Sequence, residues 1–265
     1  MDKLGEKIGA GRTADVFAWE NDSILKLFHP AYDAAQAQRE ANHTRIAHAA
    51  GLSVPAVNDT VQINGQHGII FERIDGDLMM NRLRRQPWTV IRMARLLADL
   101  HIALHQSRAT ELPSLRDRLN RKIQQVEVLS PPIKERVLQR LEQLPDDTVI
   151  CHGDFHPENI ILNDKRAVVI DWVDATAGHP LADVTRTALI LDSIEPTTGN
   201  RFLSAFARLA RSVYLKRYLA RSGQFTQQQL DTWWLPVAAA RLVERVEGEE
   251  SWLIEGIERR LAAHD

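Results

Sequence analysis

A block of short apolar runs inside an otherwise helix-like part of the chain most restricts how the protein folds. Residues 148–172 contain "TVIC", "IIL" and "AVVI", three runs of strand length that are separated by polar loops. Two carboxylates and an amide, Asp154, Asn159 and Asp171, lie in this block, where apolar packing is expected. Burial of a polar side chain costs free energy unless the side chain is hydrogen-bonded. The block is therefore the first place to look for a functional site.

The sequence on both sides of this block carries helical spacing. Apolar residues recur four, three and four positions apart at Met93, Leu97, Leu100 and Leu104. A second set with the same spacing is Phe202, Phe206, Leu209 and Val213. Each set predicts one buried helix face. The segment "PSLRDRLNRKIQQVEVLSPPIKERVLQRLEQLP" predicts two charged helices, broken at Pro131-Pro132.

The beginning of the chain has a different character. Glycines and a polar "WENDS" turn between residues 4 and 28 indicate a hairpin, and the alanine-rich residues 33–50 indicate a helix. Asn64-Gly65 is a strong hairpin turn signal. We therefore expect an α+β protein with a small β-rich lobe at residues 1–73 and a larger, mainly helical lobe at residues 74–265.

Composition narrows the class of function. The 265 residues are 44% hydrophobic and 26% charged with a net charge of -2, which predicts no nucleic-acid partner and no membrane-surface partner. No apolar run approaches the roughly 18 residues of a membrane-spanning helix, and the first residues lack the apolar segment of a signal peptide. The one cysteine, Cys151, fits a reducing compartment. We expect a cytoplasmic protein. These features do not indicate whether it is a monomer or an oligomer.

Asp154, Asn159 and Asp171 form a set whose residue types and spacing are moderately specific for a metal-dependent reaction. Asp154 and Asn159 are five positions apart on "HGDFHPEN", where a proline predicts an irregular loop, and Asp171 follows the run "AVVI". Asn159 and Asp171 carry oxygen ligands of the kind that Mg²⁺ takes. Asp154 remains to accept or orient a hydroxyl proton, as in kinase-type reactions. The alternative for each residue is a capping or loop-bonding role.

A glycine segment near the start of the chain adds a candidate nucleotide contact. Gly9 and Gly11 stand in "IGAGRTADVF", which is close to the kinase glycine-rich loop whose backbone covers the phosphates of ATP. Ala14 replaces the third glycine of that pattern. Two glycines in a hairpin are by themselves usually only a turn, so this segment needs support from elsewhere in the chain.

Lys26 supplies that support because it lies inside the apolar run "ILKLF". A lysine among apolar neighbours is costly unless it is paired, and Glu40, on the predicted helix that follows, is the expected partner. The pair would hold Lys26 toward the α- and β-phosphates. The alternatives are an edge-strand lysine in solvent and a solvated helix face.

Together these motifs resemble the aminoglycoside phosphotransferase and choline kinase superfamily, small-molecule kinases with a two-lobed protein-kinase-like fold. "HGDFHPENI" is similar to the catalytic loop of that family, and "VIDWVDA" is similar to its metal-binding segment. The likeness runs from Gly9 to about Leu191. The resemblance implies binding of ATP, or of GTP, with Mg²⁺, and transfer of the γ-phosphoryl group to a hydroxyl of a small molecule.

The resemblance also implies roles for individual residues. Asp154 corresponds to the catalytic base, and Asn159 and Asp171 correspond to the metal ligands. Lys26 corresponds to the lysine that binds the phosphates, with Glu40 as its partner.

Further positions follow from the same resemblance. "FERIDG" is similar to the hinge segment, so the backbone of Glu72 and Ile74 is expected to hydrogen-bond the nucleobase. Asp183, in "GHPLADVTR", resembles the buried aspartate that braces the catalytic loop. Candidates for the acceptor are Asp174, just beyond the expected metal ligand, and Glu247, in the acidic segment "VERVEGEESWLIEGIERR". The alternative for Glu247 is a side chain that simply faces water.

The sequence disfavours two other classes of function. A kinase of protein substrates is disfavoured because the segment between Asp171 and "GHPLAD" is too short for a long activation segment. A catalytically silent nucleotide-binding or regulatory module is disfavoured because the five key residues are all present. The acceptor stays open among aminoglycosides, amino sugars and amino alcohols.

One metal signal in the sequence is disfavoured. His101 and His105 are four positions apart, like two zinc ligands, but Ile102 stands where a zinc protease carries glutamate. We therefore expect both histidines to pack in the core or between the lobes.

Overall fold

The structure, a computed structural model, describes residues 4–20 and 22–263 and divides into two units of packing. The first unit runs through Arg82 and also includes Pro157–Ala175. The second unit comprises Leu83–His156 and the chain from Thr176 onward. The β-like block is therefore shared, since its first strand and the loop residues through His156 belong to the second unit and its remainder belongs to the first. The boundary expected after residue 73 stays a prediction.

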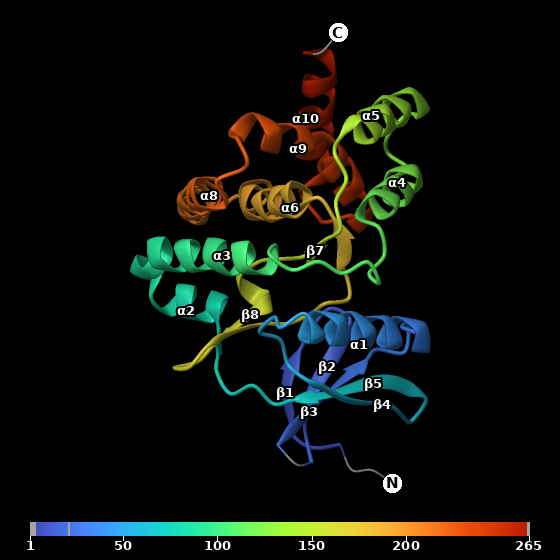
Figure 1. Cartoon of the computed structure of the whole chain (residues 1–265), viewed down its shortest axis with the longest axis vertical. Helices are drawn as coiled ribbons and strands as arrows, with labels where there is room; N and C mark the ends of the chain where they lie inside the picture. Colours follow the sequence, from blue (N-terminus) through green and yellow to red (C-terminus); the bar gives the residue numbers. More distant parts are fainter. Residues whose placement is uncertain (1–3, 21, 264–265) are drawn as a thin grey trace. The chain divides into compact units, whose positions relative to one another are not determined.

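The larger sheet of the first unit is a five-stranded antiparallel sheet with the order β1-β2-β3-β5-β4 (Figure 1). Its strands are β1 (Lys7–Ala10), β2 (Ala14–Trp19), β3 (Ser23–Phe28), β4 (Val57–Ile63) and β5 (Gln66–Glu72). Together with the helices of the second unit, this sheet confirms the expected mixed fold class.

The two predicted hairpins are present. β2 and β3 pair from Trp19↔Ser23 onward, and Asn21 of the "WENDS" turn lies outside the described residues. β4 and β5 close at Ile63↔Gln66. Their turn, Asn64-Gly65, has φ values of 50° and 83°, which asparagine and glycine adopt more readily than other residues.

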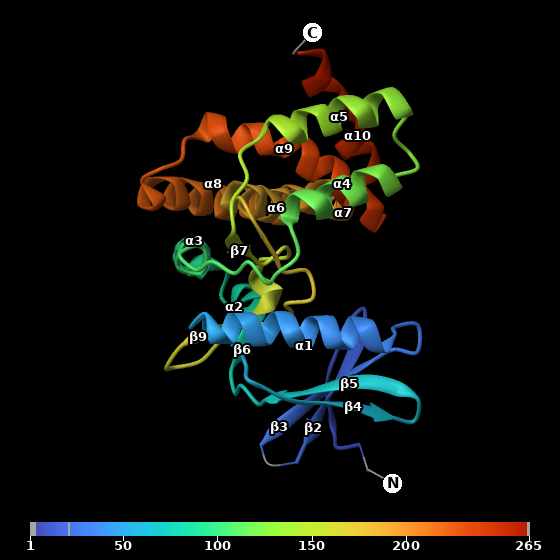
Figure 2. The same cartoon turned by 45° about the vertical axis from the view of Figure 1, so that its right-hand side comes forward.

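One helix, α1 (Ala34–Ala49), lies along one face of this sheet (Figures 1 and 2). It begins at a capping box, in which Asp33 and Gln36 satisfy each other's backbone N–H groups. Its small residues Ala37 and Ala41 are buried against Ile69 of β5 and other apolar residues of the sheet. Small side chains allow the helix to approach the sheet closely.

A second, three-stranded sheet of the first unit carries the residues that follow the catalytic loop. Its order is β6-β8-β9, and β8 pairs with both neighbours in antiparallel fashion. The elements are β6 (Asp77–Leu78), the 3-10 turn η2 (Pro157–Asn159), β8 (Ile160–Leu162) and β9 (Ala167–Val169). The strands predicted at "IIL" and "AVVI" are therefore confirmed.

The second unit is mainly helical, and Figure 2 shows α4 and α5 side by side. Its helices are α3 (Val90–Leu104), α4 (Leu115–Gln125), α5 (Pro131–Gln143), α6 (Pro180–Asp192), α7 (Ile194–Thr198), α8 (Arg201–Ser222), α9 (Gln227–Arg241) and α10 (Glu250–Ala262). The shorter elements are η1 (Pro87–Thr89), η3 (Leu242–Glu244), β7 (Val149–Cys151) and β10 (Thr176–Gly178), while α2 (Met79–Arg85) crosses from one unit to the other. α5 begins at the predicted break, Pro131.

One of the two predicted helix faces is correct and the other is wrong. Met93, Leu97 and Leu104 of α3 are buried, as their spacing predicts. On α8, by contrast, Phe202 is 89% exposed and Leu209 is 43% exposed. The buried face of α8 instead includes Tyr214 and Tyr218, and their hydroxyl groups hydrogen-bond histidines of α3. A count of apolar spacing overlooks a face that depends on such polar partners.

Membrane insertion finds no support in the helices. Across residues 4–20 and 22–263, none combines the length and the apolar character needed to cross a bilayer.

Candidate active site

The glycine segment forms the hairpin between β1 and β2. Gly9 lies opposite Val16 in the sheet, and the N–H group of Gly11 donates to the carbonyl of Ala14 at 2.8 Å. Ala14, which replaces the third glycine of the pattern, is buried in the core between the sheet and α1. The replacement therefore fills the core, while Gly9 lies in β1 and Gly11 lies in the turn.

Lys26 on β3 is paired as the sequence predicts. Its Nζ lies 2.7 Å and 2.9 Å from the two carboxylate oxygens of Glu40 on α1, and 3.0 Å from Oδ1 of Asp171. All three residues belong to the first unit. The contact with Asp171 links the predicted phosphate-binding lysine directly to the predicted metal ligand.

The electrostatics keep this lysine charged. Burial by itself would lower the pKa of Lys26, but the negative charges of Glu40 and Asp171 outweigh burial and raise that pKa. An ammonium group that is protonated and only 14% exposed can offer a fixed positive charge to an anionic ligand.

The pairing of β8 with β9 brings Asn159, just before β8, close in the fold to Asp171, just after β9. Ile160 of β8 lies opposite Val169 of β9, and the N–H group of Ile170 donates to the carbonyl of Asn159 at 3.0 Å. The φ angle of Asp171 is 65°, a left-handed conformation that aspartate tolerates better than most residues. Asn159 offers an amide oxygen and Asp171 offers carboxylate oxygens. Mg²⁺ prefers oxygen ligands of this kind.

Of the predicted hinge residues, Glu72 ends β5 and Ile74 follows it. The N–H group of Glu72 already donates to the carbonyl of Ala56 at 2.8 Å, and its carboxylate accepts from Arg166 at 3.0 Å. A nucleobase contact of Glu72 would therefore use its carbonyl oxygen. Ile74 is half-buried, two residues further on. The nucleobase contacts of both residues stay predictions.

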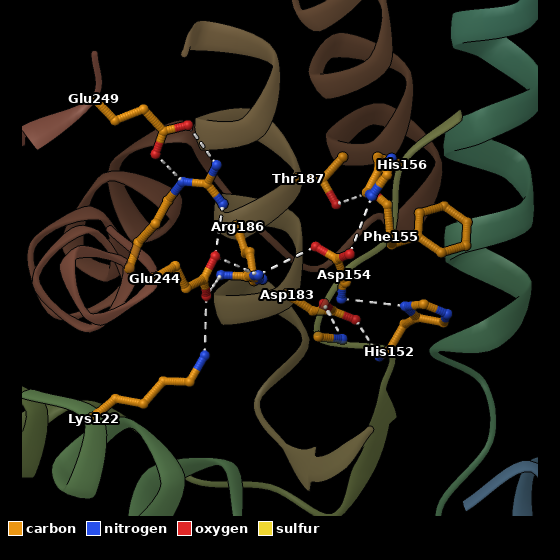
Figure 3. Close-up of polar contacts among 12 residues, drawn as sticks. Lys122, His152, Asp154, Phe155, His156, Asp183, Arg186, Thr187, Glu244 and Glu249 are labelled. Atoms are coloured by element: carbon orange, nitrogen blue, oxygen red, sulfur yellow. Dashed lines mark hydrogen bonds and ion pairs between the residues drawn. The ribbon is translucent and has the colours of Figure 1, made fainter. Parts of the chain in front are cut away.

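The loop that carries Asp154 belongs to the second unit and is braced by Asp183. The carboxylate of Asp183 accepts the backbone N–H groups of His152 and Gly153, at 2.6 Å and 2.9 Å (Figure 3). Gly153 has a φ of 80°, which glycine adopts without the strain that a side chain would add. This geometry matches the bracing role that the resemblance implied for Asp183.

His101 and His105 pack onto the same carboxylate. Nε2 of His101 lies 3.1 Å and Nε2 of His105 3.5 Å from Oδ2 of Asp183. The other ring nitrogens meet Tyr214 at 2.6 Å and Tyr218 at 2.7 Å. Burial and the neighbouring His105 lower the pKa of His101 to about 3, so its ring is neutral. The pair therefore packs in the interior, as expected, and supports the brace.

Asp154 contacts two other side chains of the second unit (Figure 3). Nε2 of His156 lies 3.1 Å from Oδ2, and Nη2 of Arg186 on α6 donates to Oδ1 at 3.2 Å. Burial favours the neutral acid, but the bond from His156 and the charge of Arg186 outweigh it and hold the pKa of Asp154 far below the usual range. Asp154 is therefore a carboxylate at neutral pH.

Sequence reasoning missed Arg186 and Glu244. Arg186 stands three positions after Asp183 on one helix face, a signal that could have drawn attention to it. Its other partner, Glu244 in η3, is distant in sequence and lies in the acidic segment whose side chains would ordinarily face water. It is instead the centre of an ion-pair cluster.

The two acceptor candidates lie in different units. Asp174 is half-buried in the segment that precedes β10, in the first unit. Glu247 is exposed in the turn between η3 and α10, in the second unit. Their roles stay predictions.

Comparison of the sequence with known protein families gives one match that covers most of the chain. The profile of the phosphotransferase enzyme family matches residues 5–221. The chain belongs to the phosphotransferase enzyme family. None of the curated proteins searched matches this phosphotransferase in sequence.

Solved structures similar to this phosphotransferase share its fold at low identity. A thermostable mutant of the aminoglycoside phosphotransferase APH(4)-Ia, in a ternary complex with ADP and hygromycin B, is 16% identical with a TM-score of 0.67 and covers 97% of this chain and 92% of its own. Choline kinase from Cryptosporidium parvum is 13% identical with a TM-score of 0.58, covering 98% and 90%. Ethanolamine kinase from Plasmodium vivax is 15% identical with a TM-score of 0.59, covering 97% and 78%.

Proposed function

We propose that this phosphotransferase uses ATP and Mg²⁺ to phosphorylate a hydroxyl group of an amine-bearing small molecule. The observation that carries the proposal is the contact of Lys26 with Glu40 and Asp171. A buried lysine held by a helix glutamate is the arrangement that kinases place on the α- and β-phosphates. Its contact with Asp171 supports the proposal, because the proposed phosphate-binding lysine and the proposed metal ligand then lie together in one unit.

The nucleotide is held by groups of the first unit. Lys26 and the backbone of the Gly9–Gly11 turn contact the phosphates, and the carbonyl of Glu72 with the N–H group of Ile74 contacts the nucleobase. Asn159 and Asp171 would hold Mg²⁺, which when bound supplies positive charge beside the phosphate oxygens.

Asp154 acts on the acceptor. Its carboxylate accepts a hydrogen bond from the acceptor hydroxyl and orients the oxygen for in-line attack. A new bond forms between this oxygen and the γ-phosphorus, while the bond from the γ-phosphorus to the bridging oxygen breaks and ADP leaves with the electron pair. The hydroxyl proton passes to Asp154. The low pKa of Asp154 makes it a weak base, which suits a loose transition state that needs alignment more than proton abstraction.

The proposed acceptor class is an aminoglycoside, an amino sugar or an amino alcohol. Structures with the same fold include a complex with hygromycin B, and proteins named choline kinase and ethanolamine kinase. Fold alone does not choose among these compounds, so the proposal commits to the class that they share, an alcohol that also carries an amine.

The test is ADP production by the purified protein with Mg-ATP, or Mg-GTP, and members of each acceptor class. Phosphorylated product, identified by mass spectrometry, is the expected result. Tight binding of Mg-ATP without transfer to any acceptor would favour the silent nucleotide-binding module. Transfer to protein substrates alone would favour a protein kinase. Either result would overturn the proposal.

A further inference from the structure

A buried arginine joins the proposed base to a second carboxylate (Figure 3). Nη2 of Arg186 donates to Oδ1 of Asp154 at 3.2 Å. The same guanidinium donates to Glu244, from Nη1 to Oε1 at 2.8 Å and from Nη2 to Oε2 at 3.2 Å. The side chain of Arg186 is only 12% exposed. It therefore bridges two carboxylates with little access to water, where ionic hydrogen bonds are stronger than at the surface.

Glu244 is itself held on its other sides. Nζ of Lys122 on α4 donates to it at 3.0 Å, and Nη1 of Arg241 on α9 donates at 3.4 Å. Arg241 in turn makes two bonds to Glu249, at 2.7 Å and 2.6 Å. Arg186 is thereby fixed by side chains from three further elements of the second unit. Rotation of the Arg186 side chain away from Asp154 would break its hydrogen bonds to Glu244.

The cluster balances its charges. Asp154, Glu244 and Glu249 supply three negative charges, and Lys122, Arg186 and Arg241 supply three positive charges. Burial raises the pKa of Glu244, but the charges of Arg186 and Lys122 outweigh it and bring that pKa to about 2. Removing one member therefore leaves a buried charge without compensation, which is more costly than losing one surface pair.

We propose that Arg186 is a positioning residue for phosphoryl transfer, which fixes the Asp154 carboxylate toward the acceptor hydroxyl and places its positive charge against that carboxylate, with Glu244 acting through Arg186. This inference rests on the proposed function in assigning Asp154 as the base. It goes beyond that function by adding two residues, Arg186 of α6 and Glu244 of η3, that act on Asp154 from behind. The effect on Asp154 itself does not depend on which acceptor is used.

The groups that face Asp154 decide the sign of the pH effect. His152 and His156 lie on its own loop, Arg186 reaches it from α6, and Glu244 lies behind Arg186. The positive charge of Arg186 stabilises the ionised carboxylate. Without that charge the pKa of Asp154 rises, while the bond from His156 still lowers it, so activity is lost at a higher pH than in wild type when the solution is acidified.

The test compares Arg186→Met, Arg186→Lys and Glu244→Gln with wild type. Arg186→Met should lower kcat about 10- to 100-fold, the effect of one charge-assisted hydrogen bond, and should shift the acidic limb of the pH profile upward. Arg186→Lys should recover part of kcat, and Glu244→Gln should show a smaller loss in the same direction. Mg-ATP binding, measured by calorimetry, should stay within about threefold in all three variants.

A matched control separates this role from general stability. Arg217→Met removes an arginine of the same unit that pairs with Asp99 at 2.7 Å, outside the Asp154 cluster, and should leave kcat unchanged. If Arg186→Met fails to fold, the double variant Arg186→Met with Glu244→Gln removes one charge of each sign and keeps the comparison possible. Thermal unfolding identifies which variants are folded.

A direct titration keeps the inference separate from the proposed function. The carboxyl ¹³C resonance of Asp154 reports the protonation of this group with no acceptor present. The midpoint of its titration should lie at a higher pH in Arg186→Met than in wild type. If wild type phosphorylates no acceptor, the proposed function fails, yet this titration still tests the electrostatic half of the inference. An unchanged titration together with kcat within about twofold of wild type would overturn it.

Discussion

Lys26 donates to both carboxylate oxygens of Glu40, at 2.7 Å and 2.9 Å, from a strand to the helix that covers its sheet. The side chain of Glu40 is 2% exposed and that of Lys26 is 14% exposed. The pair is therefore a fixed, desolvated feature of the first unit, and Glu40 can determine where the lysine points.

Glu40→Gln should lower the catalytic efficiency of the protein with ATP. The amide keeps one acceptor oxygen but removes the charge that holds Lys26, so the ammonium group shifts toward Asp171. We expect kcat/KM for ATP to fall about 10- to 100-fold, with a smaller effect on KM for the acceptor. Steady-state kinetics with each substrate varied in turn measures both. Equal losses for the two substrates would contradict a role on the nucleotide side.

Asp171→Ala should remove the metal-dependent part of nucleotide affinity. Calorimetric titration of ATP with and without Mg²⁺ should show a large difference for wild type and almost none for the variant. The loss is expected to be at least the roughly tenfold typical of disturbing a metal site. Because Asp171 has a positive φ, Asp171→Asn is the better folding control, since asparagine also tolerates that conformation. An Mg²⁺ effect that survives in Asp171→Ala would contradict the assignment.

Stability should depend on pH through His101. Its pKa is lowered to about 3 in the folded protein, whereas an unfolded histidine titrates near 6.5. The unfolded state therefore binds one more proton between these values, so the free energy of unfolding falls as pH drops from 6.5 toward 3. We expect His101→Gln to reduce this slope by up to about 1.4 kcal/mol per pH unit. Urea unfolding at several pH values measures it, and an unchanged slope would contradict the burial of a neutral ring.

Glu247→Gln should change acceptor affinity and not the rate of chemistry. Glu247 is exposed, so a contact with an amine group would contribute only about 0.2–1 kcal/mol, or up to about a fivefold increase in KM. Glu250→Gln, an exposed neighbour at the start of α10, is the matched control. A fall in kcat with KM unchanged would contradict the acceptor role of Glu247.

The sequence predicted those parts of the fold and site that depend on local pattern. The turn at Asn64-Gly65, the break at Pro131 and the pairing of Lys26 with Glu40 all follow from residue type and short-range spacing. The face of α8 was wrong because Phe202 obeys helical spacing but is exposed.

Long-range partners could not be predicted in this way. Arg186 contacts Glu244 only because α6 and η3 meet in the folded second unit. Nothing local in "ADVTR" or "RLVERVEGEE" specifies that contact, and an acidic segment usually faces water. The same limit applies to Tyr214, whose hydrogen bond to His101 selects the buried face of α8.

The most direct test of the account is ADP production by wild type and Asp154→Ala in the presence of Mg-ATP and an accepted alcohol, alongside calorimetric titration of both proteins with Mg-ATP. The account predicts that the variant loses acceptor-dependent turnover by about 10²-fold or more while Mg-ATP binds almost as before, because Asp154 orients the acceptor and the first unit holds the nucleotide. Turnover that persists in Asp154→Ala, or a loss of nucleotide binding equal to the loss of turnover, would contradict it.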